Sequence, residues 1–294
     1  MPDAEIERIR AALAARPRPP ELGERRARLD ALGEQFPVPP DVRVESVEAS
    51  GVAAEWTVTP EADPNRVLLF LHGGGYVSGS IASHRAMVAE AGRQAGVRTL
   101  ALGYRLAPEH PFPAALEDAL SGYHFLLSSG IDPRNIVIAG DSAGGGLTIA
   151  ALVSLRDAGV KLPSCGWCIS PWVDLGMTGA SMDGKAAVDP MIQKPYLQEL
   201  ATAYLAGGDP RAPLVSPLHA DLRGLPPLLI QVGAAETLLD DSVRLAGVAG
   251  AADVAVTLEV YPEMIHVWPL FHQQLAAGRR ALGAAGRFMR ERLP

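Results

Sequence analysis

Short apolar runs of strand length recur along the chain and are separated by segments long enough for helices. The runs cover residues 66–71, 98–102, 135–139, 166–169, 228–232 and 254–260. Nearly continuous apolar strands that alternate with helices are typical of a mostly parallel sheet covered by helices on both faces. The sequence therefore predicts an α/β fold, in which ligands bind beyond the carboxyl ends of the strands.

The first 40 residues carry a different pattern, in which apolar side chains recur at spacings of three and four. This spacing predicts two amphipathic helices, one over residues 6–13 and one over residues 22–36, isolated by Pro-rich joints at 17–20 and 37–40. Because two short helices cannot fold alone, we expect them to lie on the larger domain. Alternating residues between 42 and 58 then predict further strands.

Length and composition favour a single large domain with insertions. The chain has 294 residues, of which 48% are hydrophobic and 20% charged, so it can bury a large core. Its formal net charge is -7, and no Lys/Arg cluster is suited to a row of phosphates, which argues against nucleic-acid binding. The N-terminus is acidic, unlike a signal peptide, and the longest charge-free apolar stretch is too short for a membrane span. We expect a soluble, cytoplasmic protein.

The two cysteines, Cys165 and Cys168, have C-x-x-C spacing. A zinc site of this type needs a second pair, and a redox pair needs its first cysteine at a helix N-terminus. Here the cysteines lie between Pro163 and Pro171 in a predicted strand, where residues three apart face opposite sides. We therefore expect ordinary buried thiols and no metal site.

Two of the predicted strands end in glycine-rich segments. His72 and three glycines at 73–75 follow the first long strand, and we expect His72 to orient a loop whose amides are unobstructed donors. The run Gly140-Asp141-Ser142-Ala143-Gly144 follows another strand and opens a helix, which is typical of a nucleophilic serine at a sharp turn. A nucleotide-binding loop is excluded because no G-x-x-x-x-G-K-[ST] run exists.

An acid and a histidine follow the last two strands. Glu236 comes after residues 228–232, and His266 comes after residues 254–260. Together with Ser142, they occur in the chain order of the α/β-hydrolase triad, each just past a strand.

In combination these motifs resemble the hormone-sensitive-lipase-like family of bacterial α/β-hydrolase esterases. The resemblance runs over residues 68–288 and is carried by HGGGYVSGS at 72–80, YRLAPEHPFPAA at 104–115, GDSAGG at 140–145 and SPWVDL at 170–175. It implies an eight-stranded hydrolase fold, with a catalytic domain over residues 41–294. It also implies a helical cap built from residues 1–40 and an insertion at about 176–207.

The acid position departs from many members that resemble this chain. They carry Asp there and a second Asp four residues later, whereas this chain has Glu236 followed by Asp240. A glutamate can orient the imidazole equally well if the loop accommodates one more methylene. We favour Glu236 as the acid, with Asp240 and Asp241 as alternatives.

The resulting hypothesis is a serine carboxylesterase that acts through an acyl-enzyme. His266 takes the proton of Ser142, which attacks the ester carbonyl, and Glu236 holds the imidazole in the required tautomer. No metal or organic cofactor is needed. An amidase or carbamate hydrolase could use the same machinery, and a non-catalytic receptor on this fold is disfavoured because serine, acid and histidine are all retained.

The amide of Ala143 and the glycine loop would bind the oxyanion. The resemblance assigns the loop donors to Gly74 and Gly75, with Gly73 as the alternative.

Four residues near the strand ends are candidates for an apolar substrate pocket: Tyr76, Trp172, Val267 and Trp268. An alternative is that Trp172 and Trp268 only pack the cap against the sheet. The resemblance favours short- to medium-chain acyl esters as substrates. It also allows a homodimer formed through the last strand.

Overall fold

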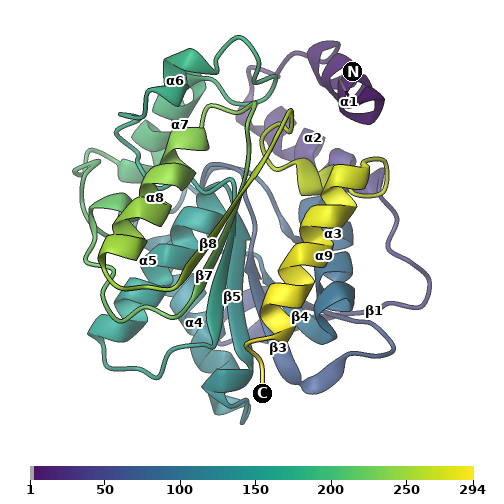
Figure 1. Ribbon diagram of the computed structural model, residues 1–294, viewed down its shortest axis with the longest axis vertical. Helices are drawn as coiled ribbons and strands as arrows, with labels where there is room; N and C mark the ends of the chain where they lie inside the picture. Colours follow the sequence, from purple (N-terminus) through teal and green to yellow (C-terminus); the bar gives the residue numbers. More distant parts are fainter. Residues whose placement is uncertain (1–2) are drawn as a thin grey trace.

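The computed structural model describes residues 3–294 and contains one eight-stranded sheet with helices on both faces (Figure 1). The strands are β1 (Arg43–Ala49), β2 (Val52–Val58), β3 (Asp63–Leu71), β4 (Val97–Leu102), β5 (Ile136–Asp141), β6 (Cys165–Ile169), β7 (Leu228–Gly233) and β8 (Val256–Tyr261). Their order is β1-β2-β4-β3-β5-β6-β7-β8. The pairs β1–β2 and β2–β4 are antiparallel and the others are parallel, so the predicted mostly parallel sheet is confirmed.

The helices lie on both faces of this sheet and over one end of it. They are α1 (Ala4–Ala14), α2 (Leu22–Glu34), α3 (Ile81–Ala95), α4 (Ala114–Ser128), α5 (Ala143–Asp157), α6 (Ser181–Gly184), α7 (Lys194–Leu205), α8 (Leu239–Ala251) and α9 (Ala276–Arg290), with short 3-10 turns η1 (Pro133–Asn135), η2 (Pro217–His219) and η3 (Trp268–Phe271). Helices α3 and α9 cover one face, and α4, α5 and α8 cover the other (Figure 1). Each face therefore has its own apolar core.

The central strand β5 shows why the apolar runs specify this arrangement. All six of its residues are buried, because helices cover both of its faces and β3 and β6 flank it. In such a position an alternating polar residue would lose its hydration without a partner.

The two cysteines lie back to back in β6. Cys168 packs in the core beneath α5, whereas Cys165 packs in the core on the opposite face. Burial raises the pKa of the Cys165 thiol to about 12 and also raises that of Cys168. The prediction of ordinary buried thiols is confirmed, and the pair is not a disulfide.

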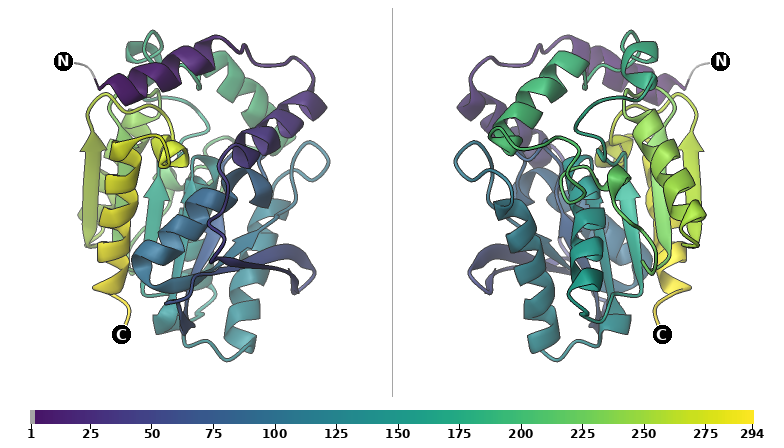
Figure 2. Two further views of the ribbon diagram at one scale, coloured as in Figure 1. Left: turned by 90° about the vertical axis from the view of Figure 1, so that its right-hand side faces the viewer. Right: turned by 90° about the vertical axis from the view of Figure 1, so that its left-hand side faces the viewer.

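Helices α1, α2, α6 and α7 lie over the end of the sheet where the parallel strands finish (Figure 2). Helix α1 buries Ile6 and Ile9 in a small apolar core with Phe36 and Phe271. In α7, the Tyr204 ring stacks on Tyr76 with a centroid distance of 3.8 Å. These contacts fix a helical layer above the strand ends. No helix within residues 3–294 is long and apolar enough to cross a bilayer.

Candidate active site

Ser142 lies in a sharp turn between β5 and α5. Its backbone has φ 54° and ψ −120°, a conformation that is strained for a residue with a side chain. The chain is closely packed at this turn, and a Cβ at Gly144 would overlap the carbonyl oxygen of Leu71. Hydrogen bonds stabilise it, with the Ser142 amide donating to Ile169 O at 2.8 Å and the Trp172 amide donating to Ser142 O at 2.9 Å. The hydroxyl is thereby presented at the end of the sheet.

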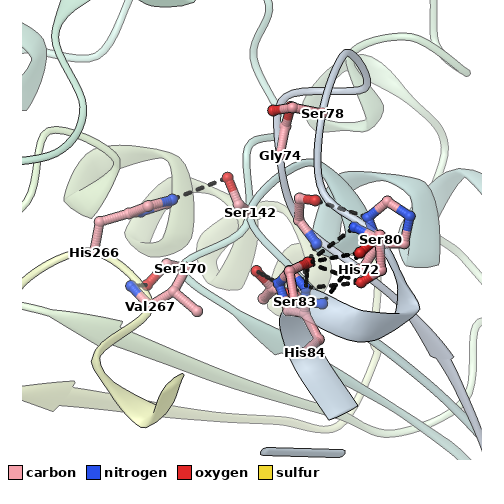
Figure 3. Close-up of polar contacts among 12 residues, drawn as sticks. His72, Gly74, Ser78, Ser80, Ser83, His84, Ser142, Ser170, His266 and Val267 are labelled. Carbon is pink, nitrogen blue, oxygen red and sulfur yellow. Dashed lines mark hydrogen bonds and ion pairs between the residues drawn. The ribbon is translucent and has the colours of Figure 1, made fainter. Parts of the chain in front are cut away.

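His266 faces this hydroxyl from the loop between β8 and η3. Its Nε2 lies 2.9 Å from Ser142 Oγ, and both side chains are buried. Figure 3 shows the two side chains pointing toward each other. The geometry suits a hydroxyl that donates to a neutral imidazole.

Glu236 lies on the other side of the imidazole. Its Oε1 is 3.5 Å from His266 Nδ1, and neither atom has a hydrogen-bond partner among the described residues. This distance is long for a hydrogen bond but within the range of an ion pair. The second oxygen, Oε2, accepts from Ser170 Oγ at 2.8 Å and from the Gly233 amide at 3.2 Å. These two donors leave Oε1 to the imidazole.

Ser170 ties the acid to the histidine loop and was not predicted as a site residue. Besides donating to Glu236, its Oγ accepts from the Val267 amide at 3.1 Å. Its signal in the sequence was its place directly after β6, at the same sheet edge as the other site residues.

The pKa of His266 reflects two opposed effects. Burial disfavours the imidazolium and lowers the pKa, but the adjacent Glu236 carboxylate outweighs burial, so the pKa is raised above its usual value. Burial also raises the pKa of Glu236, against the stabilisation of its charge by His266 and Ser170. We take Glu236 as ionised because its Oε2 accepts two hydrogen bonds.

The two alternative acids, Asp240 and Asp241, are bonded elsewhere. Asp240 Oδ2 accepts from the Ser181 amide at 2.9 Å. Asp241 Oδ2 accepts from the amides of Val173 and Asp174, and burial raises its pKa to about 8. The geometry therefore favours Glu236 as the partner of His266.

The loop that carries Glu236 is held by the segment between β6 and α7. Asp189 is buried there, and its Oδ2 accepts from the Thr237 amide at 2.8 Å. Its Oδ1 accepts from the amides of Met191 and Ile192. The position of the acid thus depends on this segment as well as on the sheet.

The glycine loop and the turn at Ser142 both carry free amides. The amides of Gly74, Gly75 and Ala143 donate to no protein acceptor within residues 3–294. Gly74 and Gly75 have φ of 121° and 67° and both line the cavity that contains Ser142. The alternative donor Gly73 is unavailable, because its amide donates to Asp141 Oδ1 at 2.9 Å.

His72 and Tyr104 support the glycine loop. His72 Nδ1 is 2.8 Å from Gly73 O, and its ring stacks on Tyr104 at 4.2 Å. Burial lowers the pKa of His72 to about 4, so this imidazole is neutral at pH 7. These contacts agree with the predicted role of His72 in orienting the loop.

A second buried histidine and carboxylate lie beside Ser142, and no sequence pattern predicted their pairing. His84 Nε2 lies 3.2 Å from Asp141 Oδ2, while the other oxygen of Asp141 accepts from Gly73. His84 Nδ1 is 2.8 Å from Ser83 Oγ (Figure 3). Burial acts against the His84 imidazolium, but Asp141 outweighs it and raises the pKa.

A cavity of about 700 Å³ opens above these groups and is lined by Ser142 and His266. Its walls are largely apolar and include Ile9, Leu32, Phe36, Leu197, Leu200 and Leu270. Half of these residues come from α1, α2 and the joint that follows α2.

Of the four predicted pocket residues, only Val267 lines this cavity. The prediction was wrong for Tyr76, Trp172 and Trp268, which are at most 2% exposed. Tyr76 stacks between α7 and the sheet, Trp172 donates to Asp174 O, and Trp268 packs on Tyr261. These aromatic side chains fill the interior because a large ring stabilises the fold more when it is fully buried than when it lines a solvent-filled cavity.

Comparison with known proteins places this geometry among hydrolases. A family model described as the alpha/beta hydrolase fold matches residues 68–270. An acetyl-hydrolase of Streptomyces hygroscopicus is 47% identical over 292 residues, which cover 98% of this chain and 96% of that protein. An esterase of Acinetobacter venetianus is 35% identical over 264 residues, covering 88% and 86%.

Solved structures extend this similarity to the whole chain. An esterase from the bacterial hormone-sensitive lipase family superposes with a TM-score of 0.97 at 45% sequence identity, covering 100% of both chains. The similarity therefore includes α1 and α2, which lie outside the match to the family model.

Proposed function

Because the chain belongs to the α/β-hydrolase family, among the carboxylic ester hydrolases of the bacterial hormone-sensitive-lipase type, we propose that Ser142, His266 and Glu236 are its catalytic triad. The observation that carries the proposal is the distance of 2.9 Å between His266 Nε2 and Ser142 Oγ, with Glu236 behind the imidazole. A nucleophile, a base within hydrogen-bond reach and a group that orients the base are the parts that acyl transfer requires.

In the first step, His266 accepts the proton of Ser142 as Oγ attacks the ester carbonyl carbon. The tetrahedral intermediate collapses, His266 gives the proton to the leaving alcohol, and an acyl-enzyme remains on Ser142. Water then attacks the acyl carbon by the same route and releases the acid. Glu236 stays ionised and stabilises the imidazolium formed in each step.

The oxyanion of each intermediate would be bound by the amides of Gly74, Gly75 and Ala143. Their lack of protein acceptors supports this role, since a donor that is already paired would have to break a bond to serve. Ala143 also begins α5, where the positive end of the helix dipole favours an anion.

We further propose a division into a cap, built from residues 1–40 and about 176–207, and a catalytic domain over the rest of residues 41–294. The cap supplies much of the apolar wall of the cavity, including Leu32 and Leu197. A cavity of about 700 Å³ with such walls favours short- to medium-chain acyl esters.

A series of p-nitrophenyl esters from acetate to laurate tests this proposal, with a fluorophosphonate probe to identify the labelled residue. We expect kcat/KM to peak between the two- and eight-carbon acyl chains and the label to lie on Ser142. A label on any other residue would contradict the triad. The matched p-nitroacetanilide should react far more slowly than the acetate ester, whereas comparable rates would favour amide hydrolysis.

A homodimer through β8 stays a prediction. Within the part of the chain that the structure describes, β8 is the last strand of the sheet and pairs only with β7, which leaves its outer edge open to another strand. Light scattering during gel filtration would measure the mass of the particle.

A further inference from the structure

Five arginines line the cavity above Ser142, and all of them come from the first 28 residues. They are Arg8 on α1, Arg16 and Arg18 in the joint after α1, and Arg25 and Arg28 on α2. Arg8, Arg16 and Arg18 are exposed to solvent as well. The five residues are called here the arginine rim. Three of them both line the cavity and reach solvent, which places these three at its mouth.

Most of the charge on the arginine rim has no acidic partner. Of these five arginines, only Arg25 forms an ion pair within residues 3–294, with Glu199 at 2.5 Å. Arg28 donates to the carbonyl oxygens of Arg16 and Pro17, and Arg18 donates to that of Met191. A carbonyl satisfies an N–H group but leaves the positive charge in place, so these bonds orient the guanidinium groups without neutralising them.

The acidic groups of the cavity do not neutralise the arginine rim either. Only Glu5 and Asp141 are acidic among the residues that line the cavity. Glu5 accepts from the Ala276 amide at 2.6 Å, and Asp141 is bonded to Gly73 and His84 beside the nucleophile. The mouth is thus positive although the whole chain has a formal net charge of -7. Such a local field attracts anions and repels cations.

Contacts with α7 hold part of the arginine rim in place. The Arg18 guanidinium lies 3.3 Å from the centroid of the Tyr196 ring, and Arg25 lies 5.7 Å from the same centroid. A guanidinium stacked on an aromatic ring loses less side-chain entropy when it binds an anion. The arginine rim is in this respect a prepared binding surface.

We propose that the enzyme acts on esters that carry a second, anionic group, such as a carboxylate or a phosphate, at the end of the substrate remote from the scissile bond. This inference rests on the proposed function of Ser142. The apolar wall would hold the chain that joins the two ends, and the arginine rim would bind the anion. The family model begins at residue 68, so the arginine rim belongs to a part of the chain outside that match.

The test compares two esters of the same acyl length, the mono-p-nitrophenyl ester of adipic acid and p-nitrophenyl hexanoate. Each kcat/KM is divided by the rate constant for alkaline hydrolysis of that ester, and the ratio of anionic to neutral substrate is the readout. We expect the double variant Arg16→Gln with Arg18→Gln to lower this ratio about tenfold, because two charge-assisted contacts are removed. The ratio of the wild type should also fall with added salt.

Two control variants separate charge from fold. The Lys variant, Arg16→Lys with Arg18→Lys, keeps the charge and should retain most of the ratio. Arg134→Gln removes an exposed arginine in η1, before the start of β5, and should leave the ratio unchanged. Hydrolysis of the neutral hexanoate by each variant checks that its active site is intact.

An unchanged ratio in the Gln variant would overturn the proposal. If the wild type hydrolyses neither ester, the proposed function itself is wrong, and the two failures are therefore distinguishable. Sedimentation with phosphatidylglycerol vesicles tests whether the arginine rim binds an anionic lipid surface instead. Loss of vesicle binding in the Gln variant with no change in the ratio would assign the arginine rim to a lipid surface and also overturn the proposal.

Discussion

Two buried pairs of histidine and carboxylate flank Ser142, and they differ in one respect that decides their chemistry. His266 lies 3.5 Å from Glu236, and His84 lies 3.2 Å from Asp141. Both histidines are buried, and both have a raised pKa because the adjacent carboxylate outweighs burial. In burial, and in the direction in which the histidine pKa is shifted, the two pairs are alike.

The difference lies in the second nitrogen of each ring. His84 Nδ1 is engaged by Ser83 Oγ at 2.8 Å, so both nitrogens of His84 have protein partners. The second nitrogen of His266 instead faces the hydroxyl of Ser142 in the cavity. A pair of this kind becomes a general base when it leaves one nitrogen to a reactive group, and it becomes a positioning device when both are bonded. The pair His84–Asp141 holds Gly73, and through it the glycine loop.

Ser142→Ala removes the hydroxyl that His266 contacts and that has no counterpart at His84. Of the variants considered, it should lower kcat the most. We expect kcat on p-nitrophenyl acetate to fall by on the order of 10⁶, because no nucleophile remains beside His266. Burst kinetics with wild type and variant would measure the loss. A variant that retains a near-normal rate would refute the role of Ser142.

Glu236→Gln should cost about 10³- to 10⁴-fold in kcat, because a neutral amide neither stabilises the imidazolium nor fixes its tautomer. Asp240→Asn is the matched control, since Asp240 bonds Ser181 and not the imidazole. Steady-state rates on the same ester compare the two variants. A larger loss in Asp240→Asn would transfer the role of the acid to that residue.

His84→Gln should lower kcat by about tenfold, because a poorly held glycine loop misplaces its donors. Because His84 positions the glycine loop and does not contact the reacting atoms, the pH dependence of kcat/KM should keep its midpoint while the rate falls. A shifted midpoint would mean that His84 takes part in proton transfer. Thermal unfolding of the same variant would report any general loss of stability.

The smallest expected effect is on the pH dependence of kcat/KM. His266 must be neutral to accept a proton, so kcat/KM should rise with pH, and the raised pKa puts the midpoint above the value of about 6.5 for a free histidine. In Glu236→Gln the remaining activity should titrate at lower pH, because burial alone lowers the pKa of His266. A profile measured from pH 5 to pH 9 tests both expectations. A flat profile in the wild type would contradict them.

The sequence predicted the parts of the site that depend on the ends of strands. Ser142, Glu236 and His266 each follow a strand whose apolar run is visible in the sequence, and a parallel sheet brings those ends together. The same reasoning could have included Ser170, which follows β6. The eight strands and the helical layer were expected from the resemblance to a family and not from the periodicity of apolar residues, and the order of the strands was not predicted.

The rest depended on packing that no local pattern specifies. His84 lies within α3, and its partner Asp141 is 57 residues away. Tyr76 and Trp172 follow strands as the site residues do, but their rings turn into the interior. The arginine rim was missed because its members are spread over α1, the joint and α2, and become neighbours only when these helices fold back over the sheet.

The back-to-back cysteines of β6 have a practical consequence for fluorescence work. Cys165 and Cys168 are both fully buried, and their raised pKa values leave almost no thiolate at neutral pH. The native protein should therefore not react with maleimide dyes. A single cysteine introduced at the exposed Ala11 of α1 would then carry the only label. Such a dye would report movements of the first helix in real time, against a background free of other reactive thiols.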